Sequence, residues 1–311
     1  MTILLAADVD AQALGQWRDL LQAALPAERI VTDRAGEDAG DIDVAIVANP
    51  PPGALRDLPH LRLIQSLWAG VDKLLADATV PPAVPIARMV DPAMTAAMTE
   101  TALWAVLSLH RGFQVYAAQQ RTQTWQPLPQ RRADEVQVAV LGLGEMGRSV
   151  AQRLTTQGYR VSGWSRQPRT LPAITTHHGD AALPAVLGAA DIVINLLPLT
   201  PATRGLLNAD RFEAMRRGAC LVNLARGAHV VDADLLDALD RGQLQHAVLD
   251  VFNTEPLPAG HRYWVHPQVT VLPHAAALTD ARSAAGIAAA NVRRLRAGEP
   301  LQHLVARAQG Y

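Results

Sequence analysis

Short apolar runs alternate with amphipathic stretches along the chain, and this alternation predicts an α/β fold. In the first ninety residues, several apolar runs have the length of strands, and one stretch has the apolar spacing of a helix. The predicted strands are Ile3–Ala7, Val44–Ala48, Leu63–Ser66 and Ile86–Arg88, and the predicted helix is Ala11–Ala24. Strands separated by helices favour a mostly parallel sheet with helices on both faces.

A second series of the same kind occupies the later part of the chain. Its six apolar runs predict a full doubly wound sheet, with strands at Val136–Leu141, Tyr159–Trp164, Asp191–Leu196, Ala219–Asn223, Gln245–Val251 and Val269–Leu272. Between the two series, the Ala- and Leu-rich stretch from Thr95 to Gln120 contains no proline and predicts one long buried helix. The polar segment from Gln119 to Arg132 contains two prolines and predicts an extended arm.

The composition adds a domain count and excludes some partners. With 311 residues, of which 49% are hydrophobic and 18% charged, the chain is typical of a folded globular protein and long enough for two domains. Its 28 basic and 29 acidic side chains leave a net charge of -1, which argues against nucleic acid and anionic membranes as partners. No apolar run approaches the ~18 residues of a membrane-spanning helix. The first residues show no basic leader.

Two residue types are rare enough to exclude kinds of chemistry. Lys73 is the only lysine, which argues against a Schiff-base mechanism and against a P-loop. Cys220 is the only cysteine, and its apolar neighbours predict a buried structural thiol rather than a disulfide or a zinc ligand. No histidine has metal-ligand spacing to another ligand on a helix face. We therefore expect no metal and a reducing compartment, the cytoplasm.

The strongest local motif lies at the end of the strand predicted over Val136–Leu141. Gly142, Gly144 and Gly147 form G-x-G-x-x-G, with Glu145 and Met146 inside the motif, and a helix is predicted over Ser149–Thr156. A strand that enters a glycine-rich turn and then a helix is typical of dinucleotide binding, because the pyrophosphate approaches the backbone at the helix N-terminus. A purely structural glycine turn is the alternative.

The next predicted strand carries the signal for the choice of cofactor. NAD is usually held there by a carboxylate that binds the adenosine ribose. This chain has Trp164, Ser165 and Arg166 at that position, with no carboxylate. A hydroxyl and a guanidinium suit a 2′-phosphate, so NADP(H) is the expected cofactor and NAD(H) remains possible.

Three further polar residues follow apolar runs of the second series. Arg226 follows the run that ends at Asn223, Glu255 lies in a turn after Val251, and His274 follows Leu272. Because the carboxyl ends of parallel strands meet at one edge of a sheet, we expect these three side chains to converge near the nucleotide turn. Taken singly, each is better explained as an ordinary loop residue, whereas the three together, behind a nucleotide turn, favour a site.

Five motifs follow one another along nearly the whole chain, namely G-L-G-E-M-G, L-P-L-T-P-A-T, L-V-N-L-A-R-G, L-D-V-F-N-T-E-P and P-H-A-A. Together they resemble those of the D-isomer-specific 2-hydroxyacid dehydrogenases. Within that family the chain most closely resembles the bacterial glyoxylate/hydroxypyruvate reductase A type, in Trp164-Ser165-Arg166, in Trp125-Gln126-Pro127-Leu128-Pro129 and in the ending Ala308-Gln-Gly-Tyr311. The resemblance implies a Rossmann NAD(P)-binding domain over residues 96–277. This domain is inserted into a flavodoxin-like substrate domain made of residues 1–95 and 278–311, with the active site in the crevice between them.

The resemblance also implies roles for individual residues. Arg226 would bind the substrate carboxylate, His274 would donate the proton and Glu255 would be the partner of His274. A loop of the first domain would bind the same carboxylate through Ala69, Gly70 and Val71. The cofactor-binding positions implied are Gly142, Gly144, Glu145, Met146, Gly147, Trp164, Ser165, Arg166, Leu197, Pro198, Thr203, Leu224, Asp250 and His274.

The expected function is an NADPH-preferring reductase that converts small 2-oxo acids, glyoxylate and hydroxypyruvate, to D-2-hydroxy acids. One departure concerns the pocket, because relatives of this type commonly carry Trp-His where this chain has Ala48-Asn49, so a bulkier 2-oxo acid is also possible. There are two alternatives. One is a dehydrogenase of another 2-hydroxy acid such as 3-phosphoglycerate, and the other is a dinucleotide-sensing protein without turnover. The apolar connector helix and the arm near Trp125 suggest a homodimer.

Overall fold

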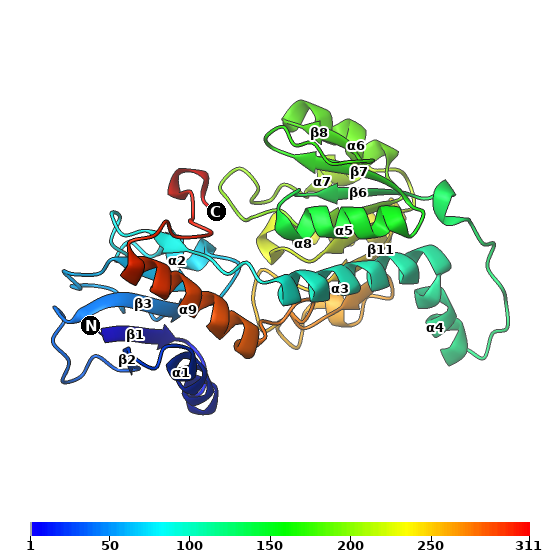
Figure 1. The fold of residues 1–311 in the computed structure, drawn as a ribbon. Helices are drawn as coiled ribbons and strands as arrows, with labels where there is room; N and C mark the ends of the chain where they lie inside the picture. Colours follow the sequence, from blue (N-terminus) through cyan, green and yellow to red (C-terminus); the bar gives the residue numbers. More distant parts are fainter. Residues whose placement is uncertain (1) are drawn as a thin grey trace. The chain divides into compact units, whose positions relative to one another are not determined.

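The computed structural model describes residues 2–311, which form two compact units (Figure 1). Unit 1 contains the residues up to Met94 together with Thr279–Tyr311, and unit 2 contains Thr95–Leu278. Each unit is built on a parallel sheet with helices packed against it. The predicted α/β class with two parallel-sheet domains is therefore confirmed.

Within the described residues, unit 1 has a five-stranded sheet in the order β2-β1-β3-β4-β5. The strands are β1 (Thr2–Ala7), β2 (Arg29–Val31), β3 (Ile42–Ala48), β4 (Leu63–Ser66) and β5 (Ile86–Ala87), and the helices are α1 (Ala11–Ala24), α2 (Asp72–Ala76) and α9 (Ala281–Ala297). Every pairing is parallel, and β3 is buried along its whole length, as expected for a central strand covered on both faces. This strand order is that of flavodoxin-like sheets.

The end of the chain returns to complete unit 1. Helix α9 presents a buried alanine-rich face, and the buried amide of Asn291 on this helix donates to Gln65 Oε1 of β4 at 2.8 Å. Near the end of α9, the Arg296 guanidinium pairs with Glu28 at 2.7 Å and also with Asp43. Polar contacts between segments this far apart in sequence fix the register of α9 on the sheet.

Unit 2 has a seven-stranded parallel sheet, counted over the residues that the structure describes, in the order β12-β11-β10-β9-β6-β7-β8. Its strands are β6 (Gln137–Leu141), β7 (Arg160–Ser165), β8 (Thr175–His178), β9 (Ile192–Asn195), β10 (Ala219–Asn223), β11 (Leu244–Leu249) and β12 (Val269–Val271). Its helices are α5 (Glu145–Thr156), α6 (Leu183–Ala189), α7 (Ala209–Ala214) and α8 (Asp232–Asp240), and α3 (Pro92–Arg111) and α4 (Phe113–Arg121) precede them. The strand order reverses between β6 and β9, which is where doubly wound sheets bind ligands.

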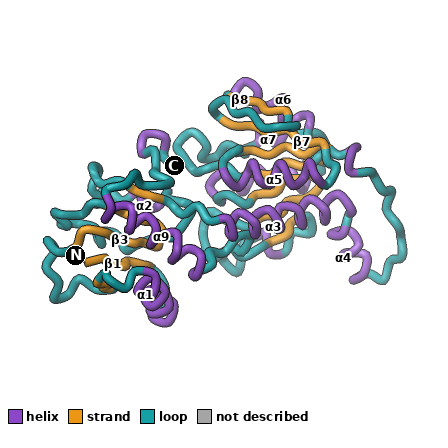
Figure 2. Tube along the Cα trace, viewed as in Figure 1, coloured by secondary structure: helices purple, strands orange, loops and turns teal. Residues whose placement is uncertain are grey.

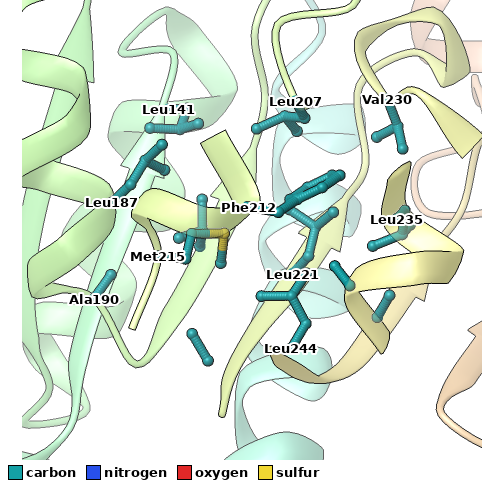
Figure 3. Close-up of a cluster of buried hydrophobic side chains, with 14 of the residues drawn as sticks. Leu141, Leu187, Ala190, Leu207, Phe212, Met215, Leu221, Val230, Leu235 and Leu244 are labelled. Atoms are coloured by element: carbon teal, nitrogen blue, oxygen red, sulfur yellow. The ribbon is translucent and has the colours of Figure 1, made fainter. Parts of the chain in front are cut away.

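Alternate residues of these strands feed two separate cores on the two faces of the sheet. Leu141 and Leu221 pack with α6, α7 and α8 in the cluster shown in Figure 3. Val140 and Val222, one residue away in each strand, pack with α3 and α5. Cys220 belongs to this second core, and burial raises the pKa of its thiol to about 12. The thiol is therefore protonated and structural, as the apolar run around it predicts.

Three elements differ from the sequence prediction. The short strand β2 of unit 1 is not among the predicted strands. The predicted sheet of six strands has a seventh, β8, whose sequence Thr-Thr-His-His lacks an apolar face because it is an edge strand. The helix predicted over Thr95–Gln120 is interrupted at Gly112, whose φ of 69° is left-handed, and so divides into α3 and α4 (Figure 2). Although α3 has 20 residues, no helix within residues 2–311 is both long and apolar enough to cross a membrane.

Candidate active site

The glycine motif forms the turn between β6 and α5. Two of its three glycines are required by close backbone contacts, and the third borders open space. A Cβ on Gly142 would lie 2.7 Å from the carbonyl oxygen of Leu196, and a Cβ on Gly147 would lie 1.7 Å from the carbonyl oxygen of Gly142. Both positions must therefore be glycine for the turn to pack. A Cβ on Gly144 would meet no heavy atom within 4 Å.

This open space at Gly144 fits a pyrophosphate. Gly144 is the N-cap of α5, so the N–H groups of the first turn lack a side-chain partner from the cap. Of the other motif residues, Glu145 pairs with Arg148 on the helix surface, and Met146 packs partly against the core. The glycine turn thus has the shape and the electrostatics of a dinucleotide site.

The three residues at the end of β7 are placed differently from one another. The indole of Trp164 is buried in the core and donates through Nε1 to the carbonyl oxygen of Gly179 at 3.0 Å. Ser165 Oγ donates to the carbonyl oxygen of Gln167 at 2.7 Å, and Arg166 is half-buried. The hydroxyl and the guanidinium therefore stand at the strand end, whereas Trp164 contributes to packing.

A pair of buried side-chain amides joins the last residues of β9 and β10. Asn195 Nδ2 donates to Asn223 Oδ1 at 2.9 Å, and Asn195 Oδ1 accepts the N–H of Leu197 at 3.2 Å. Both asparagines are fully buried. Sequence analysis did not single out these two residues, although both are polar residues that end apolar runs.

The loop after β9 contains Leu197, Pro198 and Thr203. Leu197 and Thr203 are nearly buried, and the Thr203 hydroxyl donates to the carbonyl oxygen of Pro198 at 2.8 Å. The same hydroxyl accepts the N–H of Thr200 at 2.8 Å. Thr203 is therefore occupied in holding the shape of this loop.

Arg226 lies in the loop after β10, and its backbone is fixed on two sides. Asn223 Nδ2 donates to the carbonyl oxygen of Arg226 at 3.0 Å, and Leu224, which is buried, donates its N–H to Asn195 O at 3.2 Å. The next residue, Gly227, packs so closely that a Cβ there would lie 1.9 Å from the carbonyl carbon of Phe252. Arg226 itself is half-buried, so its guanidinium is partly shielded from water.

Glu255 and His274 form a direct pair. His274 Nδ1 lies 2.7 Å from Glu255 Oε2, and the other carboxylate oxygen of Glu255 accepts the N–H of Phe252 at 2.9 Å. The side chain of His274 is 51% exposed and that of Glu255 is 34% exposed, so the imidazole is accessible to a small molecule. A carboxylate on Nδ1 fixes the orientation of the ring and leaves Nε2 for proton transfer.

Asp250 holds the turn that carries His274. Its side chain is 1% exposed, and Oδ1 accepts the N–H groups of Ala275 at 2.7 Å and Ala276 at 3.1 Å. Burial raises the pKa of the Asp250 carboxyl, and these two N–H groups act in the opposite direction. The carboxyl therefore holds the backbone of the two residues that follow His274.

The remaining predicted residues belong to unit 1. Ala69 and Gly70 are half-buried in the turn between β4 and α2, and Val71 is buried and caps that short helix. The turn is tied to β4 by Ser66, whose Oγ accepts the N–H of Trp68 at 3.0 Å. Ala48, at the departure from relatives, is fully buried, and Asn49 has a left-handed φ of 46°.

Comparison with known proteins places this arrangement in a family. Residues 103–276 match the model described as D-isomer specific 2-hydroxyacid dehydrogenase, NAD binding domain, which is more than half of the chain. The chain belongs to this family. As a D-2-hydroxyacid dehydrogenase it is an oxidoreductase, and the predicted enzyme class is confirmed. Within residues 2–311, no group of three His, Cys, Asp or Glu side chains is arranged to hold a metal ion.

Individual relatives of this D-2-hydroxyacid dehydrogenase match it over more than nine tenths of its length. Glyoxylate/hydroxypyruvate reductase A of Serratia proteamaculans (strain 568) is 41% identical over 289 residues, which cover 91% of this chain and 92% of that protein. The D-isomer specific 2-hydroxyacid dehydrogenase of Xanthobacter autotrophicus Py2, in complex with NADPH and MES, is 40% identical, with a TM-score of 0.94 over 100% of this chain and 99% of that chain. The NADPH-dependent glyoxylate/hydroxypyruvate reductase of Sinorhizobium meliloti, in complex with NADP and sulfate, is 33% identical, with a TM-score of 0.92 and the same coverage.

Proposed function

We propose that this protein is an NADPH-preferring reductase of small 2-oxo acids that yields D-2-hydroxy acids, with glyoxylate and hydroxypyruvate as the preferred substrates. The observation that carries the proposal is the Glu255–His274 pair, with 2.7 Å between Oε2 and Nδ1, in the same unit as the nucleotide-type glycine turn. A sensor without turnover has no use for an oriented proton donor. Relatives named glyoxylate/hydroxypyruvate reductase A support the choice of substrates.

In this proposal the cofactor binds to unit 2. Gly144 and the first turn of α5 hold the pyrophosphate, and Ser165 with Arg166 holds the 2′-phosphate. The reduced nicotinamide supplies the hydride when it is bound. Support for NADPH comes from the absence of a carboxylate at Ser165 and Arg166, and from structural neighbours in complex with NADPH or NADP.

The chain's own residues supply binding and proton transfer. The Arg226 guanidinium pairs with the substrate carboxylate and polarises the neighbouring carbonyl, and the turn at Ala69, Gly70 and Val71 binds the same carboxylate through backbone N–H groups. His274 Nε2 protonates the carbonyl oxygen as it becomes an alcohol. Glu255 on Nδ1 stabilises the charged imidazole before that transfer.

A direct assay tests the proposal. The loss of absorbance at the reduced-nicotinamide band is followed with NADPH and NADH in parallel, on glyoxylate, hydroxypyruvate, pyruvate, a longer 2-oxo acid and 3-phosphohydroxypyruvate. Faster oxidation of NADPH on the two- and three-carbon acids is expected. Tight NADPH binding without oxidation by any acid would contradict the enzyme and favour a sensor, and a preference for the phosphorylated acid would favour the 3-phosphoglycerate alternative.

One variant separates chemistry from cofactor binding. His274→Ala removes the proton donor, so we expect kcat to fall by about 10²–10⁴-fold. Since the glycine turn and the end of β7 are unchanged, the Kd for NADPH is expected to stay within about twofold of the wild-type value. Glu255→Gln keeps a hydrogen-bond acceptor but removes the charge. Its kcat is expected to lie between that of the wild type and that of His274→Ala.

We further propose that the protein is a cytoplasmic homodimer. Three large apolar side chains are exposed on α3, on α4 and in the loop that follows them, namely Trp104 at 44%, Phe113 at 55% and Trp125 at 98%. Exposed aromatic side chains of this size favour a protein interface. Light scattering during gel filtration, on the wild type and on Trp125→Ser, measures the mass, and cell fractionation measures the location.

A further inference from the structure

A histidine that the proposed chemistry does not use lies under the active-site loops. His229 is fully buried, and both of its ring nitrogens face backbone carbonyl oxygens. Nδ1 lies 3.1 Å from the carbonyl oxygen of Arg226, and Nε2 lies 3.3 Å from the carbonyl oxygen of Pro198. One imidazole therefore spans the loop after β10 and the loop after β9.

The backbone around His229 is anchored independently of the ring. His229 ends the short 3-10 helix over Gly227–His229, and its carbonyl oxygen accepts the N–H of Leu207 at 2.9 Å. The side chains of Leu207 and Val230 lie in the core cluster of Figure 3. Because the neighbours of His229 are held by the core, its ring has a fixed base from which to reach both carbonyls.

Each of the two carbonyls also has a donor from its own loop. The Arg226 carbonyl accepts from Asn223 Nδ2 at 3.0 Å and from the backbone N–H of His229 at 3.3 Å. The Pro198 carbonyl accepts from the Thr203 hydroxyl at 2.8 Å. These donors shape each loop separately. The His229 side chain is the group that contacts both carbonyls among the side-chain hydrogen bonds of the described residues.

We propose that His229 is a positioning residue, which sets the loop of Arg226, the proposed substrate-binding residue, against the loop of Pro198, which the family resemblance implies for cofactor binding. The inference rests on the proposed function for the roles of those two loops, and on the two ring contacts for the coupling. A carbonyl oxygen only accepts, so a ring nitrogen hydrogen-bonds to it only when that nitrogen carries a proton, which is true of one nitrogen in the neutral ring and of both in the protonated ring. Loss of one contact should release one loop and leave the other in place.

Two replacements of His229 each keep one of the two ring contacts and remove the other. The amide nitrogen of asparagine lies at about the distance of Nδ1 from the backbone, and that of glutamine at about the distance of Nε2. His229→Asn should therefore keep the contact to Arg226 and lose that to Pro198, and His229→Gln should do the reverse. The matched control is His246→Asn, which removes another buried histidine of unit 2 whose ring contacts Thr270 in the sheet.

We expect one variant to change the KM for glyoxylate and the other to change the Kd for NADPH. His229→Gln should raise the KM for glyoxylate about tenfold and leave the Kd for NADPH within about twofold, because one buried hydrogen bond to the Arg226 loop is lost. His229→Asn should leave the KM near the wild-type value and raise the Kd for NADPH several-fold. Equal changes in both variants, or a lower melting temperature with wild-type KM and Kd, would mean that His229 only fills the core.

Amide hydrogen exchange measures how firmly His229 holds the two loops, and it does not depend on enzyme activity. Faster exchange confined to residues 198–203 is expected in His229→Asn, and confined to residues 226–229 in His229→Gln. If the wild type reduces no oxo acid, the proposed function fails, and this exchange pattern still decides the role of His229. If neither variant folds, ¹⁵N-histidine NMR of the wild type replaces them: a slowly exchanging His229 ring proton is expected, and exchange as fast as at exposed His178 would overturn the proposal.

Discussion

The main-chain carbonyl of Asp250 accepts the N–H of His274 at 2.8 Å, and holds it in a left-handed conformation with φ of 52°. A non-glycine residue adopts this conformation only where its surroundings impose it. The Asp250 carboxylate adds two hydrogen bonds from the residues that follow His274. The position of the imidazole is thus set by the backbone and not only by Glu255.

Removal of the Asp250 carboxylate should therefore disturb the imidazole. In Asp250→Ala, the N–H groups of Ala275 and Ala276 lose their acceptor in a buried place, so we expect the free energy of unfolding to fall by about 3 kcal/mol. The kcat should fall at least about tenfold, since His274 loses its orientation. Asp250→Asn keeps an acceptor oxygen and is the control. Urea unfolding and steady-state kinetics measure both effects, and an unchanged kcat in the alanine variant would contradict the argument.

The glycine turn offers a separation of folding from cofactor binding. Gly147→Ala places a Cβ 1.7 Å from a backbone oxygen, and should lower the free energy of unfolding by about 3 kcal/mol or prevent folding. Gly144→Ala meets no protein atom within 4 Å, so its stability should stay within about 1 kcal/mol of the wild type. Its methyl group would occupy the proposed pyrophosphate space, and the Kd for NADPH should rise about tenfold or more. Isothermal calorimetry and thermal melts distinguish these outcomes, and unimpaired NADPH binding by Gly144→Ala would place the cofactor elsewhere.

The choice of cofactor should reverse with charge at the end of β7. In Ser165→Asp, the new carboxylate repels a 2′-phosphate and accepts hydrogen bonds from ribose hydroxyls. The ratio of kcat/KM for NADPH to that for NADH should fall by about 100-fold. Arg166→Ala should lower kcat/KM for NADPH and leave that for NADH unchanged. Arg153→Ala, at the far end of α5, removes the same charge away from the site and is the control. An unchanged ratio in both site variants would remove these residues from the specificity site.

Stability should depend on pH through His246. Burial lowers the pKa of this imidazole from 6.5 to about 4, with a smaller contribution from His266. Since the unfolded chain binds this proton at higher pH than the folded chain, the stabilisation is complete above pH 6.5 and is lost as the pH falls toward 4. The difference corresponds to about 3 kcal/mol. Urea midpoints of the wild type and of His246→Asn, measured between pH 7 and 4, should show a flatter profile in the variant.

The apolar pattern predicted most of the two sheets, and it failed where strands lie at edges or are short. β8 is polar because both its faces are partly exposed, and the three residues of β2 are too few to show a period. The long apolar stretch before the arm predicted one helix, because the pattern does not report the left-handed conformation of Gly112. In these places the local structure depends on contacts with distant parts of the chain, and a short stretch of sequence carries no information about those contacts.

The candidate site divides in the same way. Polar residues directly after apolar runs, such as Arg226 and His274, could be found because parallel strands bring their ends together. The buried amides of Asn195 and Asn223 and the ring of His229 could not, since their importance lies in partners far away in the sequence. For Trp164, the position in the motif does not predict that the indole turns into the core.

The hydrogen bond between Asn291 on α9 and Gln65 on β4 bears on the order in which the protein can be completed during synthesis. All five strands of unit 1, as described, leave the ribosome before any residue of unit 2, but α9 follows only after Leu278. Unit 2 is continuous and can fold while the first sheet still waits for its last helix. His274, the proposed proton donor, is therefore expected to be in place before unit 1 is finished.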